Sequence, residues 1–181
     1  KKFNDKYGEI DFIVHSIAFA NREDLGGDFS DLSKDGFTLA LETSSYSLVT
    51  IAREASKYFS KDGASVISMT FDASTKVYPG YNVMGTAKAA LENINRQLSA
   101  QFGPNKTRFN SISAGPLPSL SARSIPGFTE MRKAHEERSP IKRPITHEEV
   151  ANTALFLISD MSSGITGSII PVDGGYGIIA L

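Results

Sequence analysis

The chain has 181 residues, of which 40% are hydrophobic and 22% are charged, as in one globular domain with a buried core. A formal net charge of -1 gives no electrostatic reason to expect nucleic acid or an anionic membrane as a partner. The absence of cysteine excludes disulfides and thiolate chemistry, and no apolar run approaches the ~20 residues of a membrane span. We therefore expect a cytoplasmic protein without a membrane or nucleic-acid partner.

Apolar runs alternate with longer amphipathic stretches along the chain, which predicts alternating strands and helices. The last helix opens with a capping box, in which Thr146 and Glu149 exchange bonds between side chain and backbone. A Pro- and Ser-rich stretch with short helical patches precedes it. In chain order, the predicted elements are a strand at 10–15, a helix at 35–59, a strand at 64–69, a helix at 81–102, a strand at 107–113, a helix at 146–158 and a strand at 169–172.

This order indicates an α/β fold, a Rossmann-like doubly wound parallel sheet with helices on both faces. The chain starts without Met, with the end of a helix that runs directly into the first strand. None of its 15 glycines forms the G-x-G-x-x-G loop that holds a dinucleotide pyrophosphate. We therefore expect residues 1–181 to be a single, partial domain from which the N-terminal β-α-β-α-β portion is absent.

The most informative motif places Tyr81 seven residues before Lys88. On a helix this separation is about two turns, so both side chains project from one face, roughly 10 Å apart. The lysine can hold ribose hydroxyls, and its charge makes the nearby phenol a better donor. In open parallel sheets, ligands bind beyond the carboxyl ends of the strands, where residues 15–20, 70–72 and 115–121 are expected to converge with Tyr81.

Four blocks carry a resemblance to a known family: HSIAFA (15–20), YPGYNVMGTAKAALE (78–92), SISAGPL (111–117) and GITGSIIPVDGG (164–175). In order and spacing they resemble the enoyl-acyl-carrier-protein reductases, a divergent branch of the short-chain dehydrogenase/reductases. The Tyr-x6-Lys spacing separates this branch from the ketoacyl reductases, which use Tyr-x3-Lys, a pattern that this chain lacks. The resemblance implies reduction of trans-2-enoyl-acyl-carrier-protein in type II fatty-acid synthesis by NADH, or less often NADPH, in a homo-tetramer.

The resemblance also assigns catalytic roles. Tyr81 would stabilise and protonate the enolate, and Lys88 would hold the nicotinamide ribose. Phe71 stands where many members have a second tyrosine, and because it cannot donate a hydrogen bond it would pack against nicotinamide or the acyl chain. Tyr78 is nearby but out of register with the motif.

Binding segments follow from the same comparison. Ala18, Phe19 and Ala20 match the segment that touches the thioester, and residues 117–144 match the substrate lid. No metal is expected, because neither His135 nor His147 has a second histidine four residues on. The residues that match the cofactor-binding positions, besides Lys88, are Ser16, Ile17, Leu117, Pro118, Ser119, Leu120 and Ser121.

Two alternatives remain open on the sequence. One is a short-chain reductase of another carbonyl substrate, against which the x6 spacing argues. The other is a non-catalytic Rossmann-like binding module, which the missing glycine loop favours and the Tyr81–Lys88 pair disfavours.

Overall fold

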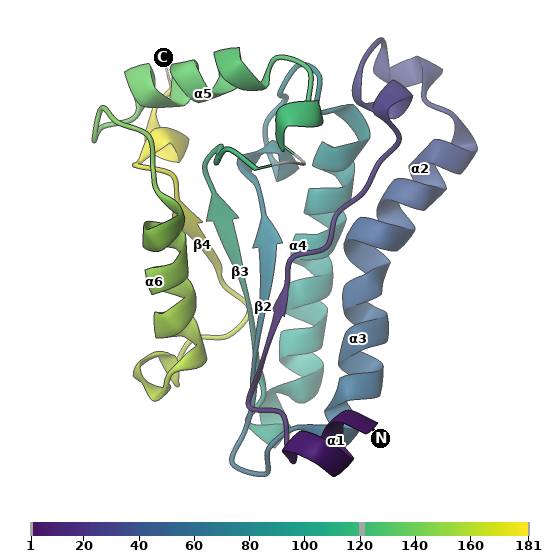
Figure 1. Cartoon of the computed structure of the whole chain (residues 1–181), viewed down its shortest axis with the longest axis vertical. Coiled ribbons are helices and arrows are strands. Elements are labelled where there is room, and N and C mark those ends of the chain that lie inside the picture. Colours follow the sequence, from purple (N-terminus) through teal and green to yellow (C-terminus); the bar gives the residue numbers. More distant parts are fainter. Residues whose placement is uncertain (1, 120–121, 181) are drawn as a thin grey trace.

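A computed structural model describes residues 2–119 and 122–180, which form a four-stranded sheet with helices packed against it (Figure 1). All neighbouring strands are parallel and follow one another in chain order, so Ile13 pairs with Val66 and Val66 with Phe109. This topology confirms the predicted Rossmann-like α/β class. The strands are β1 (Phe12–His15), β2 (Ser65–Thr70), β3 (Arg108–Ala114) and β4 (Ile169–Val172).

Helices lie on both faces of the sheet and across its upper end. Alternation along β2 sends Val66 toward α3 and α4 and Ile67 toward α6, so the two faces carry separate apolar clusters. Helix α5 lies beyond the carboxyl ends of the strands (Figure 1). No helix within the described ranges is long and apolar enough to cross a membrane. The helices are α1 (Lys2–Tyr7), α2 (Lys34–Leu41), α3 (Ser47–Ala55), α4 (Asn82–Phe102), α5 (Phe128–Arg138) and α6 (His147–Ile158).

The region predicted as one helix over 35–59 is interrupted. A π-helical turn at Glu42–Tyr46 joins α2 to α3, and α3 ends in a 3-10 turn at Ser56–Tyr58. The π turn contains two buried serines whose hydroxyls bond outside the helix, Ser45 to the carbonyl of Ala87 at 2.7 Å and Ser44 to the carbonyl of Phe19 at 3.1 Å. Apolar periodicity gives no sign of such polar contacts, which is why the sequence suggested an unbroken helix.

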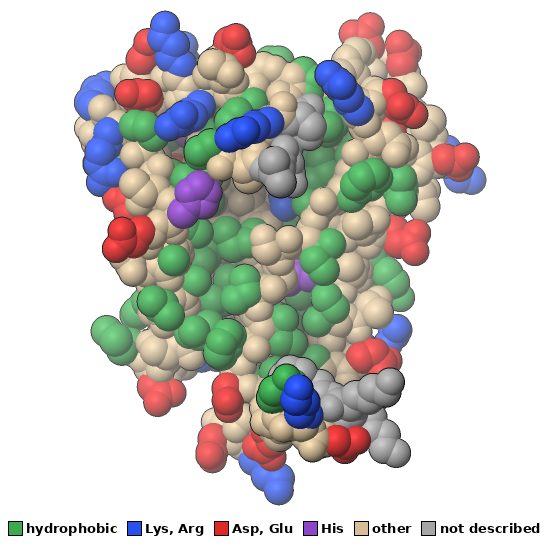
Figure 2. All heavy atoms as spheres, in the orientation of Figure 1, with side chains coloured by type: hydrophobic (Ala, Val, Ile, Leu, Met, Phe, Trp, Pro, Cys, Tyr) green, Lys and Arg blue, Asp and Glu red, His purple; other side chains and the backbone are tan. Residues whose placement is uncertain are grey.

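On the face that α6 covers, the edge strand β1 is left open. Helix α6 packs over Ile67 and Ile112 on β2 and β3, and it does not reach the edge strand. Phe12 and Val14 on β1 therefore remain 52% and 48% exposed. Hydrophobic side chains are visible on this side of the molecule in the space-filling view (Figure 2).

The start of α6 is the capping box that the sequence predicts. The amide of Glu149 donates to the Thr146 hydroxyl at 3.2 Å, and the Thr146 amide donates to the Glu149 carboxylate at 2.8 Å. Arg143 also pairs with this carboxylate at 2.7 Å. The cap fixes where the chain leaves the 117–144 segment and begins to cover the sheet.

Candidate active site

A cavity of about 420 Å³ opens at the carboxyl edge of the sheet. Three segments that are distant in the sequence meet there: the turn after β1, the start of α4 and the stretch before α5. This is the crevice that parallel strand order predicts for ligands. Its lining residues are Ala18, Phe19, Ala20, Leu25, Tyr81, Met84, Ser119, Ala122 and Ile125.

Tyr81 is the residue immediately before α4, and its ring forms part of the cavity wall. The side chain is only 8% exposed, and the edge-to-face contact with the Phe71 ring places the two centroids 5.2 Å apart. Within the described residues its hydroxyl bonds no other group. Burial raises the pKa of Tyr81 above its ordinary value, because the phenolate would lose its hydration. Tyr81 is therefore a neutral phenol, with a proton available for a ligand.

Lys88 lies two turns further along α4 and is equally buried, at 7% exposure. Its ammonium donates to the carbonyl of Met69 on β2 at 2.8 Å. Burial lowers the pKa of Lys88 to about 8, and the nearby charge of Glu92 partly offsets this effect. An ammonium has three donors, and among the described residues only the carbonyl of Met69 accepts from it, which leaves two donors for a ligand's hydroxyls.

Phe71 follows the last residue of β2 and does not line the cavity, but it is buried in one cluster with three residues that do, Leu25, Tyr81 and Met84. Its ring packs between Tyr81 and Tyr78, whose ring centroid lies 4.7 Å away. The residue therefore supports the tyrosines on both sides of it. Its predicted contact with nicotinamide or acyl chain stays a prediction.

The segment after β1 is arranged as an open turn. Ser16 and Ile17 are exposed at the carboxyl end of the strand. The Ser44 hydroxyl fixes the next part of the turn, because it accepts from the amide of Phe19 at 3.0 Å and donates to the carbonyl of the same residue. A buried serine of the π turn thus holds the backbone of the predicted substrate segment.

The predicted cofactor segment at 117–121 is only partly described. Leu117 packs against the apolar cluster beneath α6, whereas Pro118 and Ser119 are exposed. The Ser119 hydroxyl accepts from the amide of Ala122 at 3.1 Å, so it orders a local turn and keeps its O–H proton and one lone pair for a ligand. Leu120 and Ser121 lie outside the described residues.

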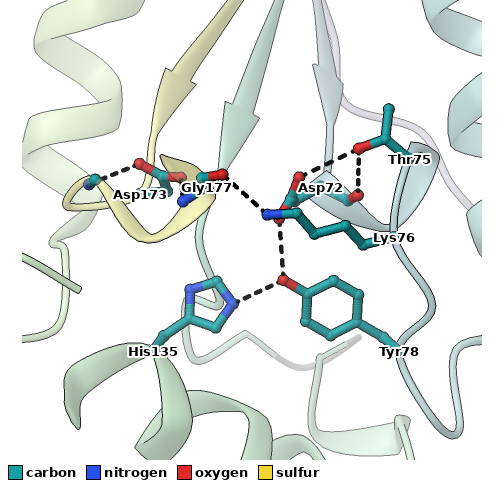
Figure 3. Close-up of polar contacts among 8 residues, drawn as sticks. Asp72, Thr75, Lys76, Tyr78, His135, Asp173 and Gly177 are labelled. Atoms are coloured by element: carbon teal, nitrogen blue, oxygen red, sulfur yellow. Dashed lines mark hydrogen bonds and ion pairs between the residues drawn. The ribbon is translucent and has the colours of Figure 1, made fainter. Parts of the chain in front are cut away.

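Sequence reasoning missed a polar and aromatic cluster beside this site (Figure 3). The Tyr78 hydroxyl lies 3.2 Å from a carboxylate oxygen of Asp72 and 3.1 Å from Nε2 of His135. Lys76 pairs with Asp72 at 2.9 Å, and the His135 ring stacks on that of Tyr176 with centroids 3.6 Å apart. Residues 72–78 adjoin the motif, but Tyr78 and His135 are 57 positions apart, and no spacing rule could have linked them.

Comparison with known proteins finds one family over nearly the whole chain. The family model described as "Enoyl-(Acyl carrier protein) reductase" matches residues 1–177. An NADH-dependent enoyl-[acyl-carrier-protein] reductase of Synechocystis sp. is 46% identical over 177 residues, which are 98% of this chain and 68% of the relative. An NADPH-dependent one of Staphylococcus aureus is 48% identical over 169 residues, 93% of this chain and 66% of the relative.

Solved structures agree with this match. The enoyl-acyl carrier protein reductase of Bacillus cereus, in complex with NADP+ and an indole naphthyridinone, superimposes with a TM-score of 0.96 at 44% identity. The superposition covers 99% of this chain and 70% of the Bacillus cereus chain. The NADH reductase of Aquifex aeolicus gives a TM-score of 0.95 at 39% identity, with the same coverage. The chain thus spans about two-thirds of the length of the proteins that it resembles.

Proposed function

Because the chain belongs to the enoyl-(acyl carrier protein) reductase family, we propose that it reduces the trans-2 double bond of an enoyl thioester on acyl carrier protein. The electron donor is NADH or NADPH, and the reaction belongs to type II fatty-acid synthesis. One observation carries the proposal: Tyr81 is a buried phenol without a protein partner for its hydroxyl in the described residues, and it faces a cavity shared with Ala18–Ala20.

The described residues fit a nicotinamide cofactor at this edge of the sheet. Lys88 offers two unused donors to the nicotinamide ribose, since its third donor is held by Met69. The exposed backbone at Ser16 and Ile17 and the stretch that begins at Leu117 border the same edge and are the proposed contacts for the rest of the dinucleotide. When bound, the reduced nicotinamide supplies a hydride to the β-carbon of the enoyl group.

Tyr81 acts on the charge that this addition creates. Hydride addition to a conjugated thioester leaves an enolate, with negative charge on the thioester oxygen. A neutral phenol aimed at that oxygen donates a hydrogen bond that is stronger in the transition state than in the ground state. Burial keeps Tyr81 protonated, so the donor is present at every pH at which the protein works, and it also supplies the proton on the path to the saturated product.

We further propose a homo-tetramer in the cytoplasm, in which residues 1–181 belong to a single Rossmann-like domain with the lid at residues 117–144. An apolar groove between α2, the π turn and α4 supports the subunit contact, because Phe37 and Tyr46 are 37% and 50% exposed along it. The absence of cysteine fits a reducing compartment. Light scattering coupled to size-exclusion chromatography measures the molar mass of the assembly and so gives the number of subunits.

The decisive experiment mixes the natural protein with NADH or NADPH and a trans-2-enoyl thioester of acyl carrier protein, and it follows the absorbance of the reduced nucleotide. Oxidation with this substrate, and none with the matching 3-keto thioester, supports the proposal. Oxidation with the keto substrate alone identifies a ketone reductase instead. If neither substrate is turned over and neither nucleotide binds in calorimetry, the chain is a binding module without catalysis.

A further inference from the structure

Helix α5 is held to the rest of the molecule by few buried groups. Among its eleven residues only His135 is buried. The helix begins after Gly127 without a side-chain cap, and Met131 and the preceding Ile125 make its apolar contacts with the cluster around Phe71. The environment of His135 therefore decides how firmly α5 is attached.

The bonds around Tyr78 can be assigned from the protons available. The Asp72 carboxylate can only accept, so the single Tyr78 proton goes to it. Nε2 of His135 must then carry a proton and donate to the Tyr78 oxygen. Burial lowers the pKa of His135 to about 4, so the ring is neutral and its Nδ1 is an acceptor, which has no partner among the described residues. The chain of donors runs from His135 through Tyr78 to Asp72 (Figure 3).

This chain of bonds joins three parts of the fold. His135 belongs to α5, Tyr78 and Asp72 to the loop after β2, and Tyr176, on which the His135 ring stacks, to the turn after β4. Lys76 joins the loop after β2 to the turn after β4, because it pairs with Asp72 and donates to the carbonyl of Gly177 at 3.1 Å. A displacement of α5 therefore breaks the bond from His135 to Tyr78 and the stacking of His135 on Tyr176.

We propose that Tyr78 is a positioning residue that fixes α5 over the candidate active site. Its ring packs on Phe71, which contacts Tyr81, and Ser119, Ala122 and Ile125, which lead into α5, line the cavity. Because these three residues are joined to α5, the position of α5 sets the width of the cavity in which the acyl group would bind. The attachment itself is a property of the fold, whereas its effect on an acyl substrate rests on the proposed function.

Hydrogen exchange tests the attachment without any assay of activity. Tyr78→Phe keeps the ring contact with Phe71 and removes the bond to His135, so amides of α5 should exchange about 3- to 10-fold faster, as for loss of one hydrogen bond of ordinary strength. Amides of α6 should be unchanged. Tyr58→Phe is the matched control, since the Tyr58 hydroxyl bonds no described group and lies at the end of α3. Unchanged exchange in α5 overturns the proposal.

A second variant separates the bond from general loosening. His135→Phe keeps an aromatic ring against Tyr176 but cannot donate to Tyr78. If the two residues act through their mutual bond, the double variant exchanges no faster in α5 than the faster single variant. If the rate increase of the double variant equals the product of the two single increases, Tyr78 and His135 act independently and the assignment is refuted.

Kinetics then test the consequence for substrate. Tyr78→Phe should raise the KM for the enoyl thioester about 3- to 10-fold, with kcat and the KM for NADH within about twofold of the wild type. A loss in kcat at unchanged KM would contradict a positioning role. If the wild-type protein turns over no enoyl thioester, the proposed function fails, while the exchange result still decides whether Tyr78 holds α5.

Discussion

Replacing Lys88 with methionine should make the cofactor-free protein more stable while it abolishes tight NADH binding. Lys88 is a buried charge on α4, next to the carbonyl of Met69 on β2, and the side chain of methionine has similar length without the ammonium. Its one bond to the described residues goes to the carbonyl of Met69, and the Glu92 carboxylate offsets only part of the cost of burial. We therefore expect this lysine to be retained for ligand binding at a cost in stability.

The size of the effect follows from the pKa. A fall from 10.5 to about 8 means that the folded protein holds this proton less tightly than the unfolded chain by about 3 kcal/mol. The methionine variant also loses the hydrogen bond to Met69, which reduces its gain in stability by about 1 kcal/mol. The net gain at pH 7 is about 2 kcal/mol, which raises the Tm of a domain of this size by about 4–8 °C.

The sign of the pH dependence is fixed by linkage. Between pH 8 and 10.5 the unfolded chain binds the Lys88 proton and the folded protein does not, so the wild-type protein gains stability from this group as pH rises. The methionine variant has no such proton. Its advantage over the wild type should therefore be largest below pH 8 and should shrink toward pH 10.5.

Thermal melts of both proteins without nucleotide, at pH 7 and at pH 9.5, measure this difference. Lys57→Met is the matched control, because the Lys57 side chain is 60% exposed and its pairing with Glu54 is a surface contact of small energy. A Lys88→Met protein that melts below the wild type at pH 7, or whose difference from it is the same at both pH values, would refute the reasoning.

Three further predictions concern binding, catalysis and the fold. NADH affinity should fall about tenfold between pH 7 and pH 9 in calorimetry, because protonated Lys88 binds the ribose and its pKa is about 8; a flat profile would contradict this. Tyr81→Phe should lower kcat about 10²–10³-fold with little change in NADH affinity, and comparable losses in both would mean that Tyr81 binds cofactor instead. Thr146→Ala should cost about 1 kcal/mol by urea unfolding, since it removes the cap of α6, whereas Thr129→Ala on the exposed face of α5 should leave the midpoint nearly unchanged.

Elements with a strong local signal were predictable from the sequence. The four strands lie within about two residues of their predicted places, because short β-rich apolar runs between turn residues have few alternatives. The cap at Thr146 needs only residues three apart, so it too was readable. The π turn was not, because it depends on Ser44 and Ser45 bonding to residues that the fold brings near.

The candidate site divides in the same way. Tyr81 and Lys88 are two helical turns apart, a spacing that can be seen in the sequence alone. The resemblance to the reductase family gave the expected role of each residue. The bonds from Ser44 in the π turn to Phe19, and those from Tyr78 to Asp72 and His135, depend on packing between segments.

Sequence by itself determined the strands, the long helix α4 and the separation of Tyr81 from Lys88 by two helical turns, since each follows from spacing within one segment. Tertiary structure alone decided which side chains become neighbours across the carboxyl edge of the sheet, and how far burial changes their proton affinities. Both depend on distances and solvent exclusion between segments as much as 101 positions apart in the sequence, which no local pattern encodes.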